Sequence, residues 1–376
     1  MTSHPTAWDL ASPLMMRVGF DVGPLHGPMT GIGRAVDGIA RGFDESNPHV
    51  HLVPYVLSFR AKLRPGTVRL PYPAALALRA WSHLDVPRPD RHLTNIDLIH
   101  GTNYVVPPSR RPRLVSVYDC WALDNESVVH PDVRSMMNVL RRAVATGAHI
   151  HASSHATADA VRRHFPGAPV SVVHLGSPDI VEPTGRSIDD VPTDSRFVLV
   201  LGTIESRKNV PFLVDCMDTV MREIGDVRLV IAGGFGDDIE NLRRAIERTP
   251  IGVRERIHVL GRVDGVVAND LLHRASVFAY PSLDEGFGFP LLEAMGARTP
   301  IVASAAGSIP EVAGDAARLC PTSDRDSWVS ALTEVLQNHD IRSQMIATGT
   351  RQRERFDWSS TSRELTDLYS SLVERV

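Results

Sequence analysis

Short runs of apolar and β-branched residues alternate with amphipathic patterns along nearly the whole chain of 376 residues. This alternation is typical of parallel sheets built from β-α-β units. In the first half it predicts strands at Met16–Asp21, His51–Tyr55, Ile96–Gly101, Arg113–Tyr118, His149–Ser153 and Val170–His174. In the second half it predicts strands over residues 197–204, 227–234, 256–263, 276–282 and 300–306. Both halves of the chain therefore have the pattern of an α/β unit.

Helices are predicted between these strands, where apolar residues recur at helical spacing. The predicted helices cover Gly31–Phe43, Pro131–Thr146, Ser154–Phe165, parts of residues 324–354 and Ser359–Arg375. The stretch from residue 62 to residue 90 is rich in Pro, Arg and Leu, and its pattern predicts no particular element.

The length of the chain exceeds one ordinary hydrophobic core and suits two domains. Residues 181–195 are polar and contain Pro183 and Pro192, which is typical of an interdomain linker. We therefore expect one domain over residues 1–180, a second over residues 196–356, and a terminal helix over residues 357–376 that packs back towards the first domain. The predicted fold class is α/β, with two doubly wound, Rossmann-like domains facing across a cleft. In such folds, ligands bind at the carboxyl ends of the strands.

The composition and net charge of the chain exclude some classes of function. The chain is 43% hydrophobic and 22% charged, with a formal net charge of −4, so it has no global basic field for nucleic acid. Its three cysteines are far apart, which fits neither a disulfide framework nor a zinc knuckle and suggests a reducing compartment. Since no signal or spanning segment is predicted, we expect a cytoplasmic protein. The basic residues Arg60, Lys62 and Arg64 leave peripheral membrane contact open, although a surface loop explains them more simply.

The strongest motif runs from Ser282 to Met295, where a predicted strand gives way to a helix. Gly286 and Gly288 would let backbone N–H groups approach an anion at the helix N-terminus. Glu285 and Glu293 would place one carboxylate in the loop and another in the first helical turn. A carboxylate there can accept hydrogen bonds from both hydroxyls of a ribose. The simpler alternative is that Glu293 complements the helix dipole and Glu285 is a solvated loop residue.

A second motif, Gly202–Asn209, places Arg207 and Lys208 at a predicted helix start, where the helix dipole favours acids. We therefore expect an external anion as compensation, and a diphosphate suits such a pair. Lys208 is one of only two lysines in the chain. The alternative is a solvated surface pair, which costs only about a few tenths of a kcal/mol.

Two further features follow predicted strands of the first half. The glycine-rich loop Gly23–Arg34 would lie at the cleft, although it lacks the third glycine of a dinucleotide fingerprint and could be a flexible loop. Tyr118 and Asp119 end a strand where working residues are often presented, or where Asp119 simply caps a turn. His151 and His155 lack the glutamate of a zinc-protease motif, and we expect them to be structural.

Together these segments resemble glycosyltransferase family 4, the mannosyltransferase-like glycosyl transferases group 1 with a GT-B fold. The resemblance covers most of the chain in the expected order and rests on D-V-G-P-L-H-G-P-M-T-G-I-G-R (21–34), V-Y-D (117–119), S-S-H-A-T (153–157), V-V-H-L-G (172–176), G-T-I-E-S-R-K-N (202–209), I-A-G (231–233), L-G (260–261), Y-P-S-L-D-E-G-F-G-F-P-L-L-E-A-M (280–295) and G-S-I-P-E-V-A-G-D-A-A (307–317). It implies a retaining, metal-independent enzyme whose N-terminal domain binds the acceptor and whose C-terminal domain binds the nucleotide sugar.

The resemblance also implies roles for individual residues. Glu293 would hold the ribose, Arg207 and Lys208 would neutralise the diphosphate, and Glu285 would contact hydroxyls of the transferred sugar. The remaining donor-binding positions would be Gly31, Gly33, Gly202, Thr203, Gly286, Phe287, Gly288, Phe289 and Leu292. Asp119 and Tyr118 complete the predicted catalytic set, whereas His26, Arg34 and the 62–90 segment would belong to the acceptor side.

Tyr118 departs from the family pattern, because many relatives carry a histidine at this position. A phenol has a pKa near 10 and cannot replace imidazole as a base at neutral pH. The resemblance implies transfer of a hexose, with GDP-mannose as the leading donor, to a glycan or lipid-linked acceptor in cell-envelope polysaccharide synthesis. The alternatives are a UDP- or ADP-sugar transferase acting on a small acceptor and a nucleotide-sugar-binding protein with little turnover. We expect no cofactor beyond the donor as co-substrate and no nucleic-acid partner, and the sequence leaves the oligomeric state open.

Overall fold

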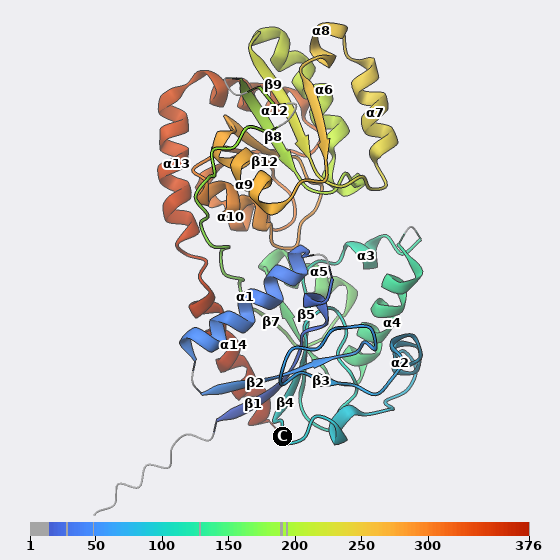
Figure 1. The fold of residues 1–376 in the computed structure, drawn as a ribbon. Coiled ribbons are helices and arrows are strands. Elements are labelled where there is room, and N and C mark those ends of the chain that lie inside the picture. The colour runs from blue at the N-terminus through green and yellow to red at the C-terminus, as the bar shows by residue number, and fades with distance from the viewer. Residues whose placement is uncertain are drawn as a thin grey trace, which may run out of the picture.

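The structure, a computed structural model, describes residues 15–27, 29–47, 49–127, 129–188, 191–192 and 195–375. The first 14 residues, on which the expected absence of a secretory signal rests, lie outside the described residues. Residues 189–190 and 193–194 of the predicted linker also lie outside them. The described chain forms two α/β units, an N-terminal domain and a C-terminal domain, stacked one above the other in Figure 1.

The N-terminal domain contains a seven-stranded parallel sheet with the order β3-β2-β1-β4-β5-β6-β7. Its strands are β1 (Met16–Asp21), β2 (Val50–Val56), β3 (Val68–Arg69), β4 (Leu98–Gly101), β5 (Arg113–Val117), β6 (His149–Ala152) and β7 (Val170–Val172). The C-terminal domain contains a six-stranded parallel sheet with the order β10-β9-β8-β11-β12-β13. Its strands are β8 (Arg196–Leu201), β9 (Val227–Ala232), β10 (Ile257–Gly261), β11 (Val277–Tyr280), β12 (Ile301–Ser304) and β13 (Ala317–Cys320).

Helices accompany both sheets. Those formed by the first half of the chain are η1 (Gly23–Leu25), α1 (Gly31–Ser46), α2 (Ala74–Trp81), η2 (Pro89–Arg91), α3 (Trp121–Asp124), α4 (Pro131–Ala145) and α5 (His155–His164). Those of the second half are η3 (Ser206–Lys208), α6 (Val210–Glu223), α7 (Ile239–Arg248), α8 (Ile251–Arg254), α9 (Gly265–Arg274), α10 (Phe289–Gly296), α11 (Ile309–Ala313), η4 (Gly314–Ala316), α12 (Arg325–Gln337), α13 (His339–Arg353) and α14 (Trp358–Val373). None of the described helices combines the length and the apolar character needed to cross a bilayer.

The predicted fold class is confirmed, because both parallel sheets have a doubly wound strand order. The pattern gave β1 with its observed bounds, Met16–Asp21. It missed β3 and α2, which both lie in the Pro-rich stretch from residue 62 to residue 90, and it missed β13. β3 pairs with β2 over only two residues, which is too short a run for any periodicity to show.

Strand order also shows where a site can form. It reverses between β1 and β4 in the N-terminal domain, and between β8 and β11 in the C-terminal domain. At such reversals, the loops that follow the two neighbouring strands diverge and leave a crevice at their carboxyl ends. The loop after β8 contains Arg207 and Lys208, and the loop after β11 contains Glu285. The C-terminal sheet therefore brings the two strongest sequence motifs to one place.

Helix α14 packs against the N-terminal domain, although it follows the C-terminal domain in the chain (Figure 1). Trp358 lies against two glycines one turn apart on α1, with its indole ring against Gly38 and its backbone carbonyl against Gly42. A Cβ atom added to Gly38 would come within 2.1 Å of the indole ring. Further along α14, Tyr369 stacks on Phe43 at 5.8 Å between ring centroids. Small residues on α1 thus allow the terminal helix to approach closely.

Candidate active site

Arg207 and Lys208 lie in η3, a short 3-10 turn between β8 and α6. Asn209 follows with a left-handed backbone, φ 54°, and α6 starts only at Val210. The prediction that the two cations begin a helix is therefore wrong, because this left-handed residue separates them from it. The backbone N–H of Leu283 donates to the Arg207 carbonyl at 2.7 Å, which ties this turn to the loop after β11.

Glu285 receives both cations on its two carboxylate oxygens. Arg207 Nη1 donates to Oε2 at 3.2 Å, and Lys208 Nζ donates to Oε1. Arg207 Nε also donates to Glu205 at 2.9 Å, and Lys208 Nζ lies 5.0 Å from the centre of the Tyr280 ring. Two acids of the protein therefore compensate the two cations. The inference that these cations require an external anion is wrong as an electrostatic argument.

The electrostatics of this cluster favour the charged forms of Arg207 and Glu285. Burial opposes the charged form of Arg207, but Glu285, Glu205 and Asp119 outweigh it and raise the pKa of Arg207. Burial alone would raise the pKa of Glu285, but Lys208 and Arg207 together lower it. Burial lowers the pKa of Lys208, and the charge of Glu285 partly offsets that shift. Arg207 Nη2 has no hydrogen-bond partner among the described residues, so a donor remains on a guanidinium that stays charged.

The loop that carries Glu285 is clamped against the N-terminal domain. The Gly286 carbonyl accepts hydrogen bonds from the hydroxyls of Ser153 at 3.1 Å, Ser154 at 2.8 Å and Thr157 at 3.1 Å. A Cβ atom on Gly286 would lie 1.6 Å from the Tyr118 carbonyl oxygen, so only glycine fits at this position. The contact brings the loops after β5 and β11 together across the cleft.

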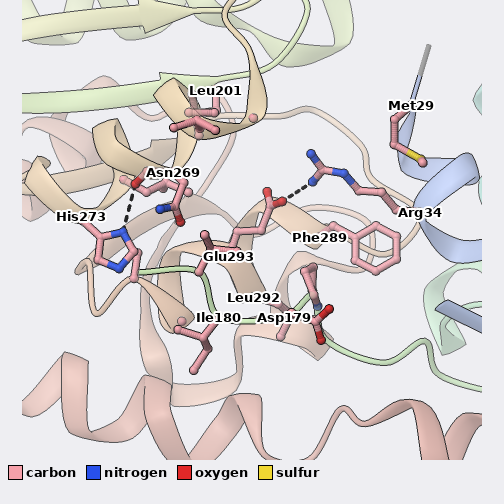
Figure 2. Close-up of a pocket in the computed structure, with 18 of the residues that line it drawn as sticks. Met29, Arg34, Asp179, Ile180, Leu201, Asn269, His273, Phe289, Leu292 and Glu293 are labelled. Atoms are coloured by element: carbon pink, nitrogen blue, oxygen red, sulfur yellow. Dashed lines mark hydrogen bonds and ion pairs between the residues drawn. The ribbon is translucent and has the colours of Figure 1, made fainter. Parts of the chain in front are cut away.

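Glu293 lies on α10, which begins after Gly288 adopts a left-handed backbone with φ 95°. It is the fifth residue of the helix, so its predicted place in the first turn is wrong. Its carboxylate accepts a hydrogen bond from Arg34 at the start of α1, across the cleft between the domains (Figure 2). The sequence assigned Arg34 to the acceptor side, whereas the structure pairs it with the predicted ribose ligand.

Both side chains line a cavity of about 600 Å³, here called the cleft cavity. Its walls include Phe289 and Leu292, two predicted donor-binding residues, and the polar residues Asn269 and His273 (Figure 2). Asp264 is a third polar residue of the lining. Sequence analysis singled out none of these three polar residues, because no local motif marks them. The arrangement offers apolar walls, a carboxylate and several hydrogen-bonding groups, which suits a nucleoside.

A second cavity, of about 500 Å³, is lined in part by Glu285 and is here called the acidic cavity. It is lined by Asp119, Asp284 and Glu285, with Arg163 as the basic residue on its wall. Burial raises the pKa of Asp119, and the charge of Arg207 partly offsets this. Burial also raises the pKa of Asp284, together with the charges of Asp119 and Glu285. The cavity therefore offers hydrogen-bond acceptors to a neutral, hydroxyl-bearing molecule.

Tyr118 is turned away from both cavities. Its side chain is 6% exposed, its ring meets Tyr104 edge-on at 6.3 Å, and burial raises its pKa. Its hydroxyl has no hydrogen-bond partner within the part of the chain that the structure describes. The Tyr118 carbonyl, by contrast, faces the loop after β11. It accepts a hydrogen bond from the Thr157 hydroxyl at 2.9 Å and contacts Gly286.

The remaining predicted donor-binding residues surround these groups. Gly31 begins α1, and the Gly33 N–H bonds the capping Thr30 hydroxyl at 3.1 Å. Gly202 directly follows β8, and Thr203 is exposed beside it. Phe287 is only 5% exposed and packs on Phe356, so its ring belongs to the core.

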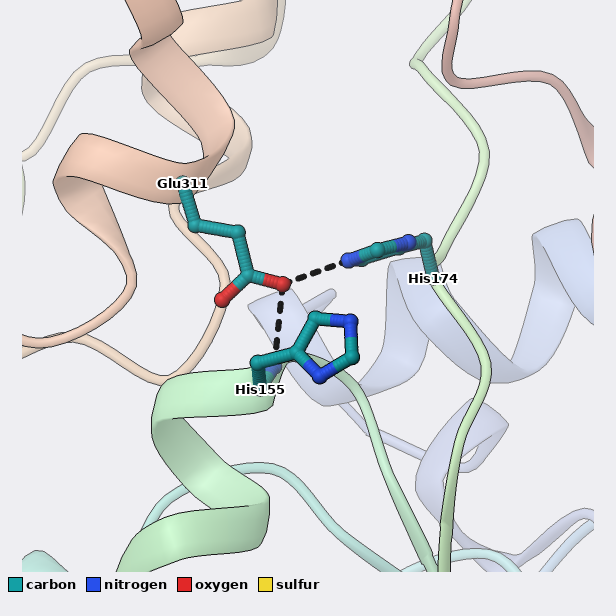
Figure 3. Close-up of side chains that lie close together, drawn as sticks. All are labelled: His155, His174 and Glu311. Carbon is teal, nitrogen blue, oxygen red and sulfur yellow. Dashed lines mark hydrogen bonds and ion pairs between the residues drawn. The ribbon is translucent and has the colours of Figure 1, made fainter.

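Glu311 makes a further contact between the domains, shown in Figure 3. It accepts hydrogen bonds from the backbone N–H groups of His155 at 2.9 Å and Ala156 at 3.2 Å, and from the His174 ring. The ligand atoms of His155, His174 and Glu311 lie within 4.8 Å of one another, a spacing that one metal ion could bridge. Capping of α5 already explains the position of both carboxylate oxygens. The sequence gave no sign of this contact, since the three residues are distant in the chain.

Part of the chain is similar in sequence to known proteins. The model of the family "Glycosyl transferases group 1" matches residues 195–338, most of the C-terminal domain. Over 212 residues the chain is 32% identical to the phosphatidyl-myo-inositol mannosyltransferase of Mycobacterium leprae, covering 53% of this chain and 55% of that protein. Over 184 residues it is 35% identical to the O-antigen chain mannosyltransferase B of Escherichia coli, covering 47% and 46%. The chain thus spans about half the length of these curated relatives.

The fold has close counterparts among solved structures. The sucrose-phosphate synthase from Thermosynechococcus elongatus superposes with a TM-score of 0.72 at 18% identity, covering 96% of this chain and 100% of that one. This likeness shows the fold alone: the chain has the two-domain GT-B fold. Within it, residues 195–338 form a glycosyl transferases group 1 domain.

Proposed function

We propose that this protein transfers a hexose from a nucleotide sugar to a glycan or lipid-linked acceptor, with retention of configuration and without a catalytic metal ion. The leading donor is GDP-mannose, and the names of two relatives, both mannosyltransferases, support mannose as the transferred sugar. The observation that carries the proposal is the cation pair at the strand-order reversal of the group 1 domain. There, Arg207 and Lys208 hold Glu285 while Arg207 keeps a donor nitrogen unused by the described residues.

Charge development explains why such a pair is useful. Breaking the bond between the anomeric carbon and the phosphate oxygen leaves negative charge on the diphosphate. Arg207 and Lys208 are fixed before the reaction, so they stabilise this charge without having to reorganise. The guanidinium offers a planar fork and the ammonium a point charge, which together suit the oxygens of two phosphates.

The engagement of Glu285 argues against a covalent route to the proposed retention. A covalent intermediate would need a free carboxylate beneath the anomeric carbon, but Lys208 and Arg207 occupy one oxygen each and lower the pKa of Glu285. A carboxylate stabilised in this way is a weak nucleophile. With the proposed retention, the acceptor hydroxyl attacks on the face that the diphosphate leaves, and its proton passes to a phosphate oxygen. Mass spectrometry that traps a glycosyl–Glu285 adduct during turnover would contradict this route.

The acidic cavity supports the acceptor side of the proposal. Carboxylates of Asp119 and Asp284 can accept hydrogen bonds from sugar hydroxyls, but they repel a phosphate. We therefore place a neutral, hydroxyl-bearing end of the acceptor there. Higher transfer to free sugars than to the same sugars carrying a phosphate would support this placement, and the reverse order would contradict it.

Donor identity is tested by calorimetric titration of the full chain with GDP, UDP and ADP. GDP should bind most tightly, and Lys208→Ala should weaken it. Undiminished binding of GDP by Lys208→Ala would overturn the diphosphate assignment. Tighter binding of UDP or ADP would instead favour transfer from another nucleotide sugar to a small acceptor. Measurable donor hydrolysis or transfer would reject the remaining alternative, a nucleotide-sugar-binding protein with little turnover.

A further inference from the structure

The ion pair between Arg34 and Glu293 crosses the cleft inside the cleft cavity (Figure 2). Arg34 is the fourth residue of α1 in the N-terminal domain, and Glu293 lies on α10 in the C-terminal domain. The side chains are 43% and 23% exposed, so neither is locked in a core and the pair can exchange partners.

The ion pair occupies a carboxylate oxygen of Glu293 that the ribose of a nucleoside would need. A ribose diol is best bound when both of its hydroxyls donate to the two oxygens of one carboxylate. Arg34 Nη1 already donates to Oε1 of Glu293. The diol and the guanidinium therefore compete for the same carboxylate.

The other acids near Arg34 are engaged elsewhere. Asp37, on the same helix, pairs with Arg41 at 3.2 Å, and Arg41 also pairs with Asp179 at 2.9 Å. Asp264, across the cavity, caps α9 through the Val267 N–H at 2.8 Å. If a diol takes Glu293, no described carboxylate stands ready to receive the Arg34 guanidinium.

A cation released in the first turn of α1 is in an unfavourable place, because the helix N-terminus carries partial positive charge. A phosphate group attached to the same nucleoside would supply the missing negative charge, in the fork geometry that guanidinium favours. The same ligand then displaces Arg34 from Glu293 through its ribose and provides a new partner for the guanidinium through its phosphate.

We propose that Arg34 is an exchangeable positioning residue: the ribose of a nucleoside diphosphate displaces it from Glu293, and its guanidinium then binds a phosphate oxygen of the same ligand. This inference rests on the proposed function and extends it, because it couples donor binding in the C-terminal domain to helix α1 of the N-terminal domain. It also separates two ligand classes. A nucleoside without phosphate has to break the ion pair between Arg34 and Glu293 and leaves the guanidinium without a partner. A nucleoside diphosphate instead provides a phosphate oxygen as a new partner for the guanidinium.

The experiment compares guanosine with GDP, and uridine with UDP, on wild type and Arg34→Ala by calorimetry or ligand-observed NMR. Arg34→Ala should bind the nucleosides about two- to fivefold more tightly, because an exposed competing ion pair has been removed. It should bind the diphosphates about tenfold or more weakly, because a charge-assisted hydrogen bond has been lost. The opposite signs for the two ligand classes are the signature of exchange, and a merely structural role would not produce them.

Arg41→Ala is the matched control, since Arg41 lies in the same helix and cavity but pairs with Asp37 and Asp179. It should not produce opposite signs. Melting curves of each variant check that helix α1 stays folded, and Arg34→Lys provides a second variant that keeps the charge but loses the fork. Arg34→Lys should bind nucleosides as tightly as wild type does. Its affinity for diphosphates should lie between the affinities of wild type and Arg34→Ala.

The outcomes distinguish a failure of the exchange from a failure of the proposed function. If wild type binds diphosphates and Arg34→Ala shifts both ligand classes in one direction, or shifts neither, the exchange is overturned and the proposed function stands. If wild type binds none of the nucleoside diphosphates, the proposed function fails and the exchange fails with it.

Discussion

Replacing Lys208 tests whether the buried cluster binds a ligand or only stabilises the fold. The Lys208 side chain is 13% exposed and the Glu285 side chain 9% exposed, so Lys208→Met leaves a carboxylate that water reaches poorly. Breaking a buried ion pair by removing one partner costs about 3–5 kcal/mol. Because Arg207 still contacts Glu285, we expect the low end, about 3 kcal/mol of unfolding free energy.

The double variant Lys208→Met with Glu285→Gln separates the two roles. It removes one positive and one negative charge, so stability should return to within about 1 kcal/mol of wild type, as replaced buried pairs often do. Binding of GDP should nevertheless stay about ten- to a hundredfold weaker, because the loss of one charged hydrogen bond to a phosphate remains. Transfer should fall about 30- to 1,000-fold in kcat/KM, the size of a lost donor at a developing charge.

The assays are chemical unfolding, calorimetric titration with GDP, and transfer measured with labelled donor. Lys62→Met is the matched control, since Lys62 is the only other lysine and is exposed. It should change neither the unfolding free energy nor the binding of GDP. If the double variant recovered both stability and wild-type binding, Lys208 would serve the fold alone, and the reasoning from charge would be refuted.

Three further predictions concern the surrounding structure. Gly286→Ala should lower kcat/KM about a hundredfold, because the added Cβ atom would lie 1.6 Å from the Tyr118 carbonyl oxygen and push the domains apart. Steady-state kinetics measure this effect, and an unchanged kcat/KM would contradict it. Gly38→Ala should cost about 1–3 kcal/mol in chemical unfolding through its clash with Trp358, whereas Gly252→Ala, with open space around it, should not; equal effects would refute the packing argument. Burial raises the pKa of Asp21 to about 7, so the folded state keeps a proton that the unfolded state has lost between about pH 4 and pH 7. Stability should therefore fall as pH rises through that window, by at most about 1.4 kcal/mol per pH unit, and Asp21→Asn should flatten the profile; a variant with the wild-type slope would reject this assignment.

The pattern of apolar residues was sufficient for the fold class, because both sheets are buried and their strands are short apolar runs. Strand β1 has its predicted bounds, and α4 differs from its prediction by one residue at one end. The elements that the pattern missed are those stabilised by tertiary contacts, such as the two-residue β3 and helix α2 in a Pro-rich stretch.

The candidate site could be predicted only in part. The local motifs located Glu285 and the cation pair, because each follows a recognisable strand. They could not show that Glu285 pairs with both cations, since this depends on β8 and β11 being neighbours in the sheet. Arg34 and Glu293 are 259 positions apart, and no local pattern links side chains across such a distance.

The most direct test of the account is a crystal structure of the protein with the nucleoside diphosphate that it binds most tightly. We expect the diphosphate to contact Arg207 Nη2 and Lys208 Nζ, and the ribose hydroxyls to contact the Glu293 carboxylate. A diphosphate bound elsewhere, with both cations still paired only to Glu285 and Glu205, would contradict the account.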